Sequence, residues 1–138
     1  MSRTLARETA VRLLYQMTFH DDFDWHDTVS NTMDVNGLTE ADNDYIDDVL
    51  SNLPQYLSII DQKITTVSHR WRIDRMSKMD LSIMRLSVYE IFYRDDIPAS
   101  VSINEAVELA KRYGSDESPA FINGLLSSVL SDADEKQE

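Results

Sequence analysis

Arginines and a tyrosine near the start of the chain are the side chains best suited to contact a ligand. One helical edge carries four residues at intervals of four: Arg3, Arg7, Val11 and Tyr15. Its two guanidinium groups and aromatic ring offer two phosphate contacts and one stacking surface. Arg12 falls on a different side. The alternative is that these arginines only keep the helix soluble, and in both cases we expect the edge to be exposed.

Catalytic and metal chemistry find little support in the sequence. There is no cysteine and no glycine-rich phosphate loop, and His20, His26 and His69 have no partners at a diagnostic spacing. The segment 20–27, HDDFDWHD, has metal-ligand residue types but neither the histidine spacing of zinc helices nor a closed ligand set. We therefore expect a binding protein without a cofactor or a metal.

The charge of the chain is unevenly distributed. The formal net charge of -12 argues against a nucleic-acid binder, because such binders neutralise phosphates. No Lys or Arg stands between Arg12 and Lys63, whereas residues 21–61 hold eleven carboxylates. A second basic cluster then follows: Lys63, Arg70, Arg72, Arg75 and Lys78. A molecule polarised in this way could hold a basic partner on one surface and a phosphate on another.

A segment apolar on most sides, 77–93, must lie at the centre of the fold. One face of the predicted helix carries Met79, Ile83 and Leu86, and the nearly opposite face carries Leu81, Val88 and Phe92. Ser77 is the predicted N-cap, with Asp80 three residues later. Since a helix of this kind is buried on all sides, other helices must surround it.

The rest of the chain is predicted to supply those helices. Apolar periodicity indicates helices at 3–19, 27–34, 39–53, 54–70, 102–114 and 119–131, and a short helical turn at 71–76. Thr39 with Asp42, and Ser102 with Glu105, fit the capping-box pattern, and Gly124 would permit close approach to a neighbouring element. We expect one soluble all-α domain over 1–131, a disordered acidic tail over 132–138 and no membrane span.

Three stretches of the sequence resemble a known family. They are ARETAVRLLYQ (6–16), IMRLSVYEIFYRDDIPASVSINEAVELAKRYG (83–114) and SPAFINGLL (118–126). In this order they closely resemble the transcription antitermination factor NusB family, over most of the chain, although residues 20–60 are less characteristic. The resemblance implies an all-α, single-domain helical bundle of about seven helices in two halves.

The resemblance also implies a function that is not enzymatic. NusB proteins bind the boxA element of nascent single-stranded RNA together with NusE, a small-subunit ribosomal protein, in an antitermination complex on RNA polymerase at ribosomal RNA operons. The implied RNA contacts are Arg3, Arg7, Arg12, Tyr15, Glu117 and Phe121. The implied partner contacts are Asp80, Asp116 and Glu117. The carboxylates could accept donors from bases or 2′-hydroxyls, and Phe121 either stacks a base or belongs to the core.

Two alternatives remain beside this interpretation. The first is an acidic protein-interaction module that binds a basic partner without contacting RNA. The second is an RNA-binding domain fused to a methyltransferase, which we do not favour because we expect no catalytic domain in these 138 residues. We further expect a cytoplasmic protein that is monomeric or forms a weak homodimer.

Overall fold

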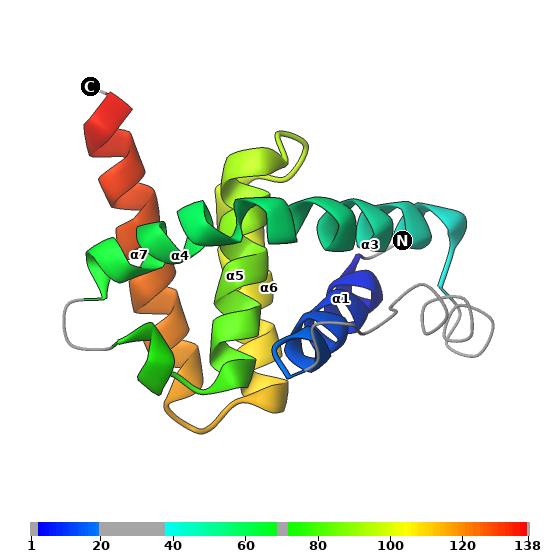
Figure 1. The fold of residues 1–138 in the computed structure, drawn as a ribbon, viewed down its shortest axis with the longest axis horizontal. Helices are drawn as coiled ribbons and strands as arrows, with labels where there is room; N and C mark the ends of the chain where they lie inside the picture. The colour runs from blue at the N-terminus through cyan, green and yellow to red at the C-terminus, as the bar shows by residue number, and fades with distance from the viewer. Residues whose placement is uncertain (1–2, 20–37, 69–71, 138) are drawn as a thin grey trace. The chain divides into compact units, whose positions relative to one another are not determined.

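The computed structural model describes residues 3–19, 38–68 and 72–137, with side chains as far as 133, and these residues are helical without a strand. Six α-helices appear in these ranges, labelled as in Figure 1: α1 (Thr4–Met17), α3 (Glu40–Asn52), α4 (Leu57–Val67), α5 (Lys78–Tyr93), α6 (Ala99–Tyr113) and α7 (Ser118–Gln137). Two 3₁₀ turns accompany them, η1 (Leu53–Tyr56) and η2 (Ile73–Arg75). The all-α prediction is confirmed. The helix predicted at 27–34 lies outside the described residues.

The chain divides into two compact units, Met1–Pro54 and Gln55–Glu138. The predicted bundle in two halves agrees with this division, whereas the predicted limits of the domain and its tail stay predictions. α7 includes residues 132–137, which the sequence predicts to be a disordered tail. None of the helices in the described ranges has an apolar stretch long enough to cross a bilayer.

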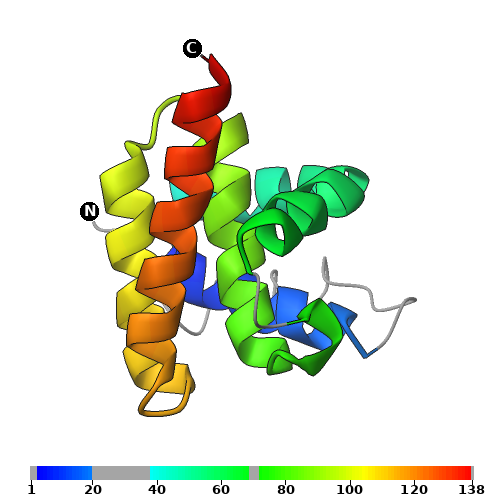
Figure 2. The ribbon, with the colours of Figure 1, turned by 90° about the vertical axis from the view of Figure 1, so that its left-hand side faces the viewer.

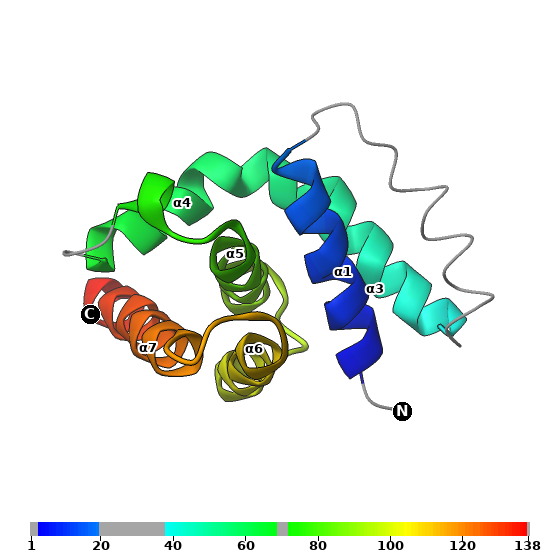
Figure 3. The same cartoon turned by 90° about the horizontal axis from the view of Figure 1, so that it is seen from below.

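The first unit contains α1 packed beside α3 (Figure 3). The predicted core face of α1 is buried at Ala6, Ala10, Leu13 and Leu14. α3 begins with the predicted capping box: the Thr39 amide donates to the Asp42 carboxylate over 2.9 Å, and the Asp42 amide donates to Thr39 Oγ1 over 3.1 Å. This reciprocal pair satisfies two amides that the first turn of a helix leaves without partners, and it fixes where α3 starts.

The second unit is built around α5, as predicted. Ser77 Oγ accepts a hydrogen bond from the Asp80 amide at its start, and the helix is buried from Leu81 to Met84 and from Leu86 to Glu90. The other helices of this unit, α4, α6 and α7, all pack against it (Figures 1 and 2). Because apolar side chains leave α5 in every direction, enclosing it removes more apolar surface from water than any two-sided packing would.

The predicted start of α6 is wrong. The helix begins at Ala99, directly after Pro98, and not at a Ser102–Glu105 capping box. Ser102 lies inside the helix, 2% exposed, and its Oγ is 3.0 Å from Ser87 Oγ of α5. Pro98 is in extended geometry, so the chain turns into the helix immediately after it. The Ser102 hydroxyl therefore joins two helices where the sequence indicated a cap.

The helix predicted at 54–70 also differs from the one in the structure. Instead of one helix over 54–70, η1 includes Pro54 and α4 begins at Leu57, while the helical turn predicted at 71–76 is present as η2.

An ion pair joins α4 to α5: Arg85 Nε and Nη2 donate to the two oxygens of Asp61 over 2.9 and 2.8 Å. Two parallel bonds of this kind fix both the distance and the rotation between the helices.

The two glycines of the second unit behave differently. A Cβ added at Gly114 would lie 2.6 Å from the Cβ and Oγ of Ser118 and 2.9 Å from the Ala110 carbonyl oxygen, so the turn between α6 and α7 has no space for a side chain. A Cβ at Gly124 would meet no atom within 4 Å. The prediction that Gly124 permits close approach to a neighbouring element is therefore wrong within this chain.

Candidate nucleic-acid and partner interface

The arginines of α1 are less accessible than predicted. Arg7 is only 4% exposed, and its guanidinium carbon lies 6.0 Å from the centroid of the Tyr45 ring in α3. Arg3 is half-buried and lies over the same ring at 5.1 Å. The expectation of an exposed arginine edge is wrong for Arg7, because Tyr45 offers a π face that the long arginine side chains cover. Sequence periodicity marked Tyr45 as apolar and gave no sign of this role.

Arg12 and Tyr15 keep more of their surface. The Arg12 side chain is 58% exposed and pairs with Glu8 over 3.6 Å, one helical turn away. Tyr15 is half-buried, and its ring meets Phe19 edge-to-face with centroids 5.1 Å apart. An exposed guanidinium in a weak surface pair remains available for a phosphate, since such a pair contributes little energy. Arg12 and Arg3 are thus the accessible cations among the three predicted contacts.

The second unit holds a pocket where α5 and α7 begin. Its volume is about 160 Å³, and its lining comes from η2, the start of α5, the turn after α6 and the start of α7: Arg75, Met76, Ser77, Asp80, Ser115, Glu117, Ser118 and Phe121. Three of the predicted contacts, Asp80, Glu117 and Phe121, are therefore brought together. Phe121 is half-buried, intermediate between the two roles expected for it.

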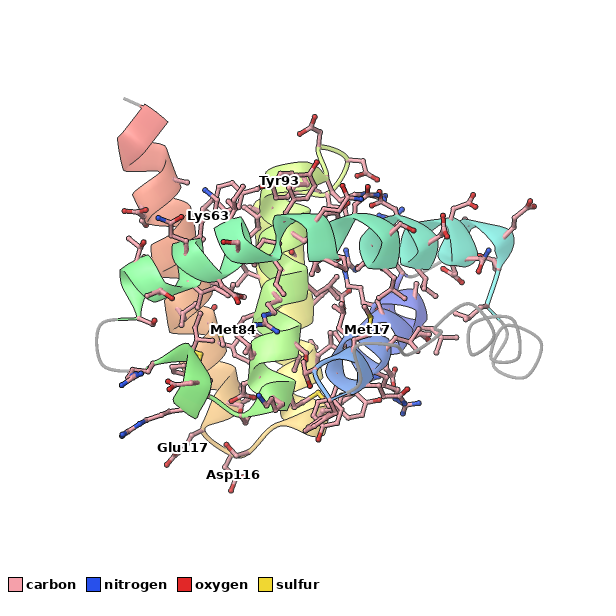
Figure 4. The ribbon with its side chains drawn as sticks, in the orientation of Figure 1. Met17, Lys63, Met84, Tyr93, Asp116 and Glu117 are labelled. Atoms are coloured by element: carbon pink, nitrogen blue, oxygen red, sulfur yellow. The ribbon has the colours of Figure 1, made fainter. Side chains whose placement is uncertain are left out.

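Asp116 is exposed and does not line this pocket. It lies next to Glu117, which is also exposed, and Figure 4 shows both side chains projecting outward at the turn before α7. Two carboxylates on a turn at the rim of a pocket present a negative edge to any approaching partner. A basic partner would meet them first.

Asp80 is held in the pocket by a hydrogen bond from α7. Ser118 Oγ lies 3.0 Å from Asp80 Oδ2 and donates to it, while Asp80 Oδ1 is buried and has no hydrogen-bond partner among the described residues. A buried carboxylate oxygen without a donor is unfavourable. A ligand that brings an N–H or O–H group to this oxygen would relieve that penalty.

Other residues of this pocket were not predicted as contacts. Arg75 belongs to the second basic cluster of the sequence, but Met76 and Ser115 gave no signal of their own. Residues 75–80 and 115–121 meet because the turn after Gly114 brings the start of α7 beside the start of α5. The proximity of these two groups depends on the fold and not on any spacing in the sequence.

The fold and the site together define a class of protein. The described ranges contain no group of His, Asp and Glu side chains placed to hold a metal ion, and the residues gathered around the pocket are carboxylates, hydroxyls, a cation and an aromatic ring. The segment 20–27 lies outside these ranges. These side chains are suited to bind a ligand through hydrogen bonds, charge and stacking.

Comparison with known proteins identifies its family. The family model described as "NusB family" matches residues 4–131. Transcription antitermination protein NusB of Ruminiclostridium cellulolyticum is 43% identical over 94% of this chain and 88% of its own length. The protein of the same name from Acetivibrio thermocellus is 44% identical over 94% of this chain and 89% of its own. The chain belongs to the NusB family, which consists of transcription antitermination factors and not of enzymes.

Solved structures agree on the fold. The structure of T. maritima NusB has a TM-score of 0.83 and 30% identity, and the match covers 94% of this chain and 90% of that one. A chain in the crystal structure of antitermination factors NusB and NusE in complex with dsRNA has a TM-score of 0.81 at 21% identity, and the match covers 94% of this chain and 96% of that chain. At that identity the second likeness concerns the fold alone.

Proposed function

We propose that this chain acts in transcription antitermination by binding boxA-type single-stranded RNA together with NusE, as part of a complex on RNA polymerase. The observation that carries the proposal is the pocket in which Asp80, Glu117 and Phe121 meet. Its lining includes a carboxylate with a buried oxygen that lacks a donor and an aromatic ring. Bases provide N–H donors and π faces, and a basic protein provides cations, so both ligands suit this surface.

The partner is expected at the carboxylate side of the pocket. Asp80 Oδ1 and the exposed carboxylates Asp116 and Glu117 would accept hydrogen bonds from arginine or lysine side chains of NusE. Attraction between a basic protein and a chain of net charge -12 speeds their association and makes it sensitive to salt. The protein is further proposed to be cytoplasmic and monomeric or weakly dimeric, and sedimentation of the purified chain tests the second point.

Fluorescence anisotropy with labelled boxA-type RNA, with and without purified NusE, tests the RNA interaction. We expect weak binding to the chain alone and tight binding to the complex, with a scrambled RNA as the sequence control. Loss of a stacked base costs roughly 1 to 3 kcal/mol, so Phe121→Leu should weaken RNA binding about 5- to 150-fold.

Phe92→Leu is the matched control. Phe92 is a half-buried phenylalanine of α5 in the same unit, and it lines a different pocket beside Lys63. This variant should leave the RNA affinity unchanged. NusE binding without any RNA binding by the complex would instead support the acidic protein-interaction module.

A further inference from the structure

We infer that Ser118 is a positioning residue that couples the partner-binding carboxylate, Asp80, to the RNA-binding turn that carries Glu117. This inference rests on the proposed function and adds a mechanism by which one ligand promotes the binding of the other. Its basis is a chain of hydrogen bonds that runs from the start of α5, through Ser118, into the turn between α6 and α7.

Ser118 lies at the centre of this chain. It is 3% exposed, and three polar atoms surround its Oγ: Asp80 Oδ2 at 3.0 Å, the Ser115 amide nitrogen at 2.9 Å and Ser115 Oγ at 3.1 Å. A hydroxyl has one proton to donate and two lone pairs to accept with. The carboxylate can only accept, so Ser118 donates to Asp80 and accepts from both the N–H and the O–H of Ser115. This assignment uses the full hydrogen-bonding capacity of the Ser118 hydroxyl.

The turn between α6 and α7 is packed closely against Ser118. Gly114 approaches Ser118 so closely that even a methyl group there would lie 2.6 Å from its Cβ and Oγ. The backbone of the turn is therefore pressed against the side chain that binds it. Because Ser115 is held from one side and Ser118 begins α7, the two residues between them, Asp116 and Glu117, are fixed at both ends.

The opposite end of the chain of hydrogen bonds lies at the pocket. Asp80 is one of the lining residues; its Oδ1 is buried without a donor among the described residues, whereas Oδ2 is held by Ser118, so a ligand has to enter the pocket to reach Oδ1. A cation of NusE that binds Oδ1 would fix the orientation of the carboxylate. This in turn would hold the acceptor of Ser118 in place and make the turn more rigid. RNA that then contacts Glu117 or Phe121 would lose less conformational entropy on binding.

The inference predicts a specific thermodynamic result. We define the coupling factor as the RNA dissociation constant of the chain alone divided by that of its complex with NusE. Ser118→Ala removes the central hydroxyl and should lower the coupling factor by roughly fivefold, the effect of one hydrogen bond. Linkage requires that RNA enhance NusE binding less in the variant, by the same factor. A residue that only stabilised the fold would change both affinities without this reciprocal loss.

Two further variants distinguish loss of the Ser118–Asp80 hydrogen bond from a general loss of stability. Ser82→Ala removes another buried hydroxyl of the same unit, one that donates to the Lys78 carbonyl oxygen within α5, and it should leave the coupling factor unchanged. Asp80→Asn retains a carbonyl oxygen that accepts from Ser118 but replaces an oxygen of the carboxylate with an amide. It should weaken NusE binding. Adding Ser118→Ala to it should lower the coupling factor less than Ser118→Ala does alone, because the two residues act in one chain of hydrogen bonds.

Amide hydrogen exchange of the wild-type protein provides a test that needs no variant. The Ser115 N–H donates to Ser118 Oγ, so NusE binding in the absence of RNA should slow its exchange at least fivefold. Unchanged Ser115 exchange in the NusE complex, or a coupling factor within twofold of wild type in Ser118→Ala, would overturn the inference while leaving the proposed function intact. If the wild-type complex binds no RNA, the proposed function fails and the inference fails with it, whatever the exchange of Ser115.

Discussion

Arg7 lies 6.0 Å from the ring centroid of Tyr45, measured from its guanidinium carbon, and only 4% of the residue is exposed. The Arg7 side chain therefore contributes to the packing between α1 and α3, because its cation lies over an aromatic face and is largely removed from water. Arg12, on another side of the same helix, keeps 58% of its side chain exposed. The two arginines should therefore differ in what they contribute to folding.

Arg7→Ala should destabilise the protein by about 1 to 3 kcal/mol, because it removes both the cation–π contact and the buried hydrocarbon chain. Arg12→Ala should change the free energy of unfolding by less than about 0.5 kcal/mol, as expected for an exposed ion pair. Urea denaturation followed by circular dichroism measures both. Equal stability of the two variants would show that Arg7 is not held against Tyr45 in solution.

The ion pair between Asp61 and Arg85 should be worth more than a surface pair. Its side chains are 25% and 16% exposed and make two parallel hydrogen bonds between α4 and α5. A double-mutant cycle with Asp61→Ala and Arg85→Ala should give a coupling energy of about 1 to 2 kcal/mol. The exposed pair of Lys111 with Glu108 is the control and should give less than about 0.5 kcal/mol.

Gly114 and Gly124 should respond in opposite directions to the same substitution. Gly114→Ala forces a methyl group to within 2.6 Å of Ser118, and overpacking of this kind costs about 1 to 3 kcal/mol. Gly124→Ala places a methyl group in open space within α7, and the better helix propensity of alanine should add about 0.5 to 1 kcal/mol of stability. Thermal melts of both variants check this. A destabilised Gly124→Ala protein would contradict the open face of α7.

Apolar patterning predicted the fold better than it predicted the contacts between helices. The burial of α5 followed from apolar residues on opposite faces, and the start of α3 followed from Thr39 and Asp42, because both signals are local. The predicted start of α6 was wrong because the Ser–Glu pattern that caps a helix also occurs where a serine joins two helices. Ser102 joins α6 to α5 in this way, through Ser87. Capping patterns carry no information about what a hydroxyl meets across the fold.

The candidate site was predictable only in part. The resemblance selected Asp80, Glu117 and Phe121, and the fold places all three on one pocket. The sequence gave no indication that Tyr45 underlies Arg3 and Arg7 or that Ser118 bonds to Asp80. Each of these contacts joins residues 38 or more positions apart, so it arises from packing and leaves no local pattern.

The core position of α5 is tested by comparing two valines. Val88 is fully buried, and Val88→Asp should leave the protein unfolded because a buried unpaired carboxylate is too unfavourable. Val101 of α6 is 41% exposed, so Val101→Asp should remain folded and helical. Circular dichroism distinguishes the two, and the wild-type amides of α5 should exchange more slowly than those of the other helices. A folded Val88→Asp protein would mean that the core has been misplaced.

The salt dependence of RNA binding should identify the arginines that contact phosphate. Each phosphate neutralised on a single strand contributes roughly 0.7 to the slope of log affinity against log salt. Because Arg7 is buried, Arg3 and Arg12 are the arginines of α1 that we expect to contact phosphate. Alanine at either position should reduce the magnitude of this salt slope, measured for RNA binding to the NusE complex, by about 0.7. Lys111→Ala, which removes an exposed cation of α6, should leave the slope unchanged and serves as the control. Anisotropy titrations at a series of salt concentrations measure these slopes. If neither arginine variant changes the slope, α1 does not contact the phosphates, and the arginines of the second basic cluster, Arg70, Arg72 and Arg75, become the site to test next.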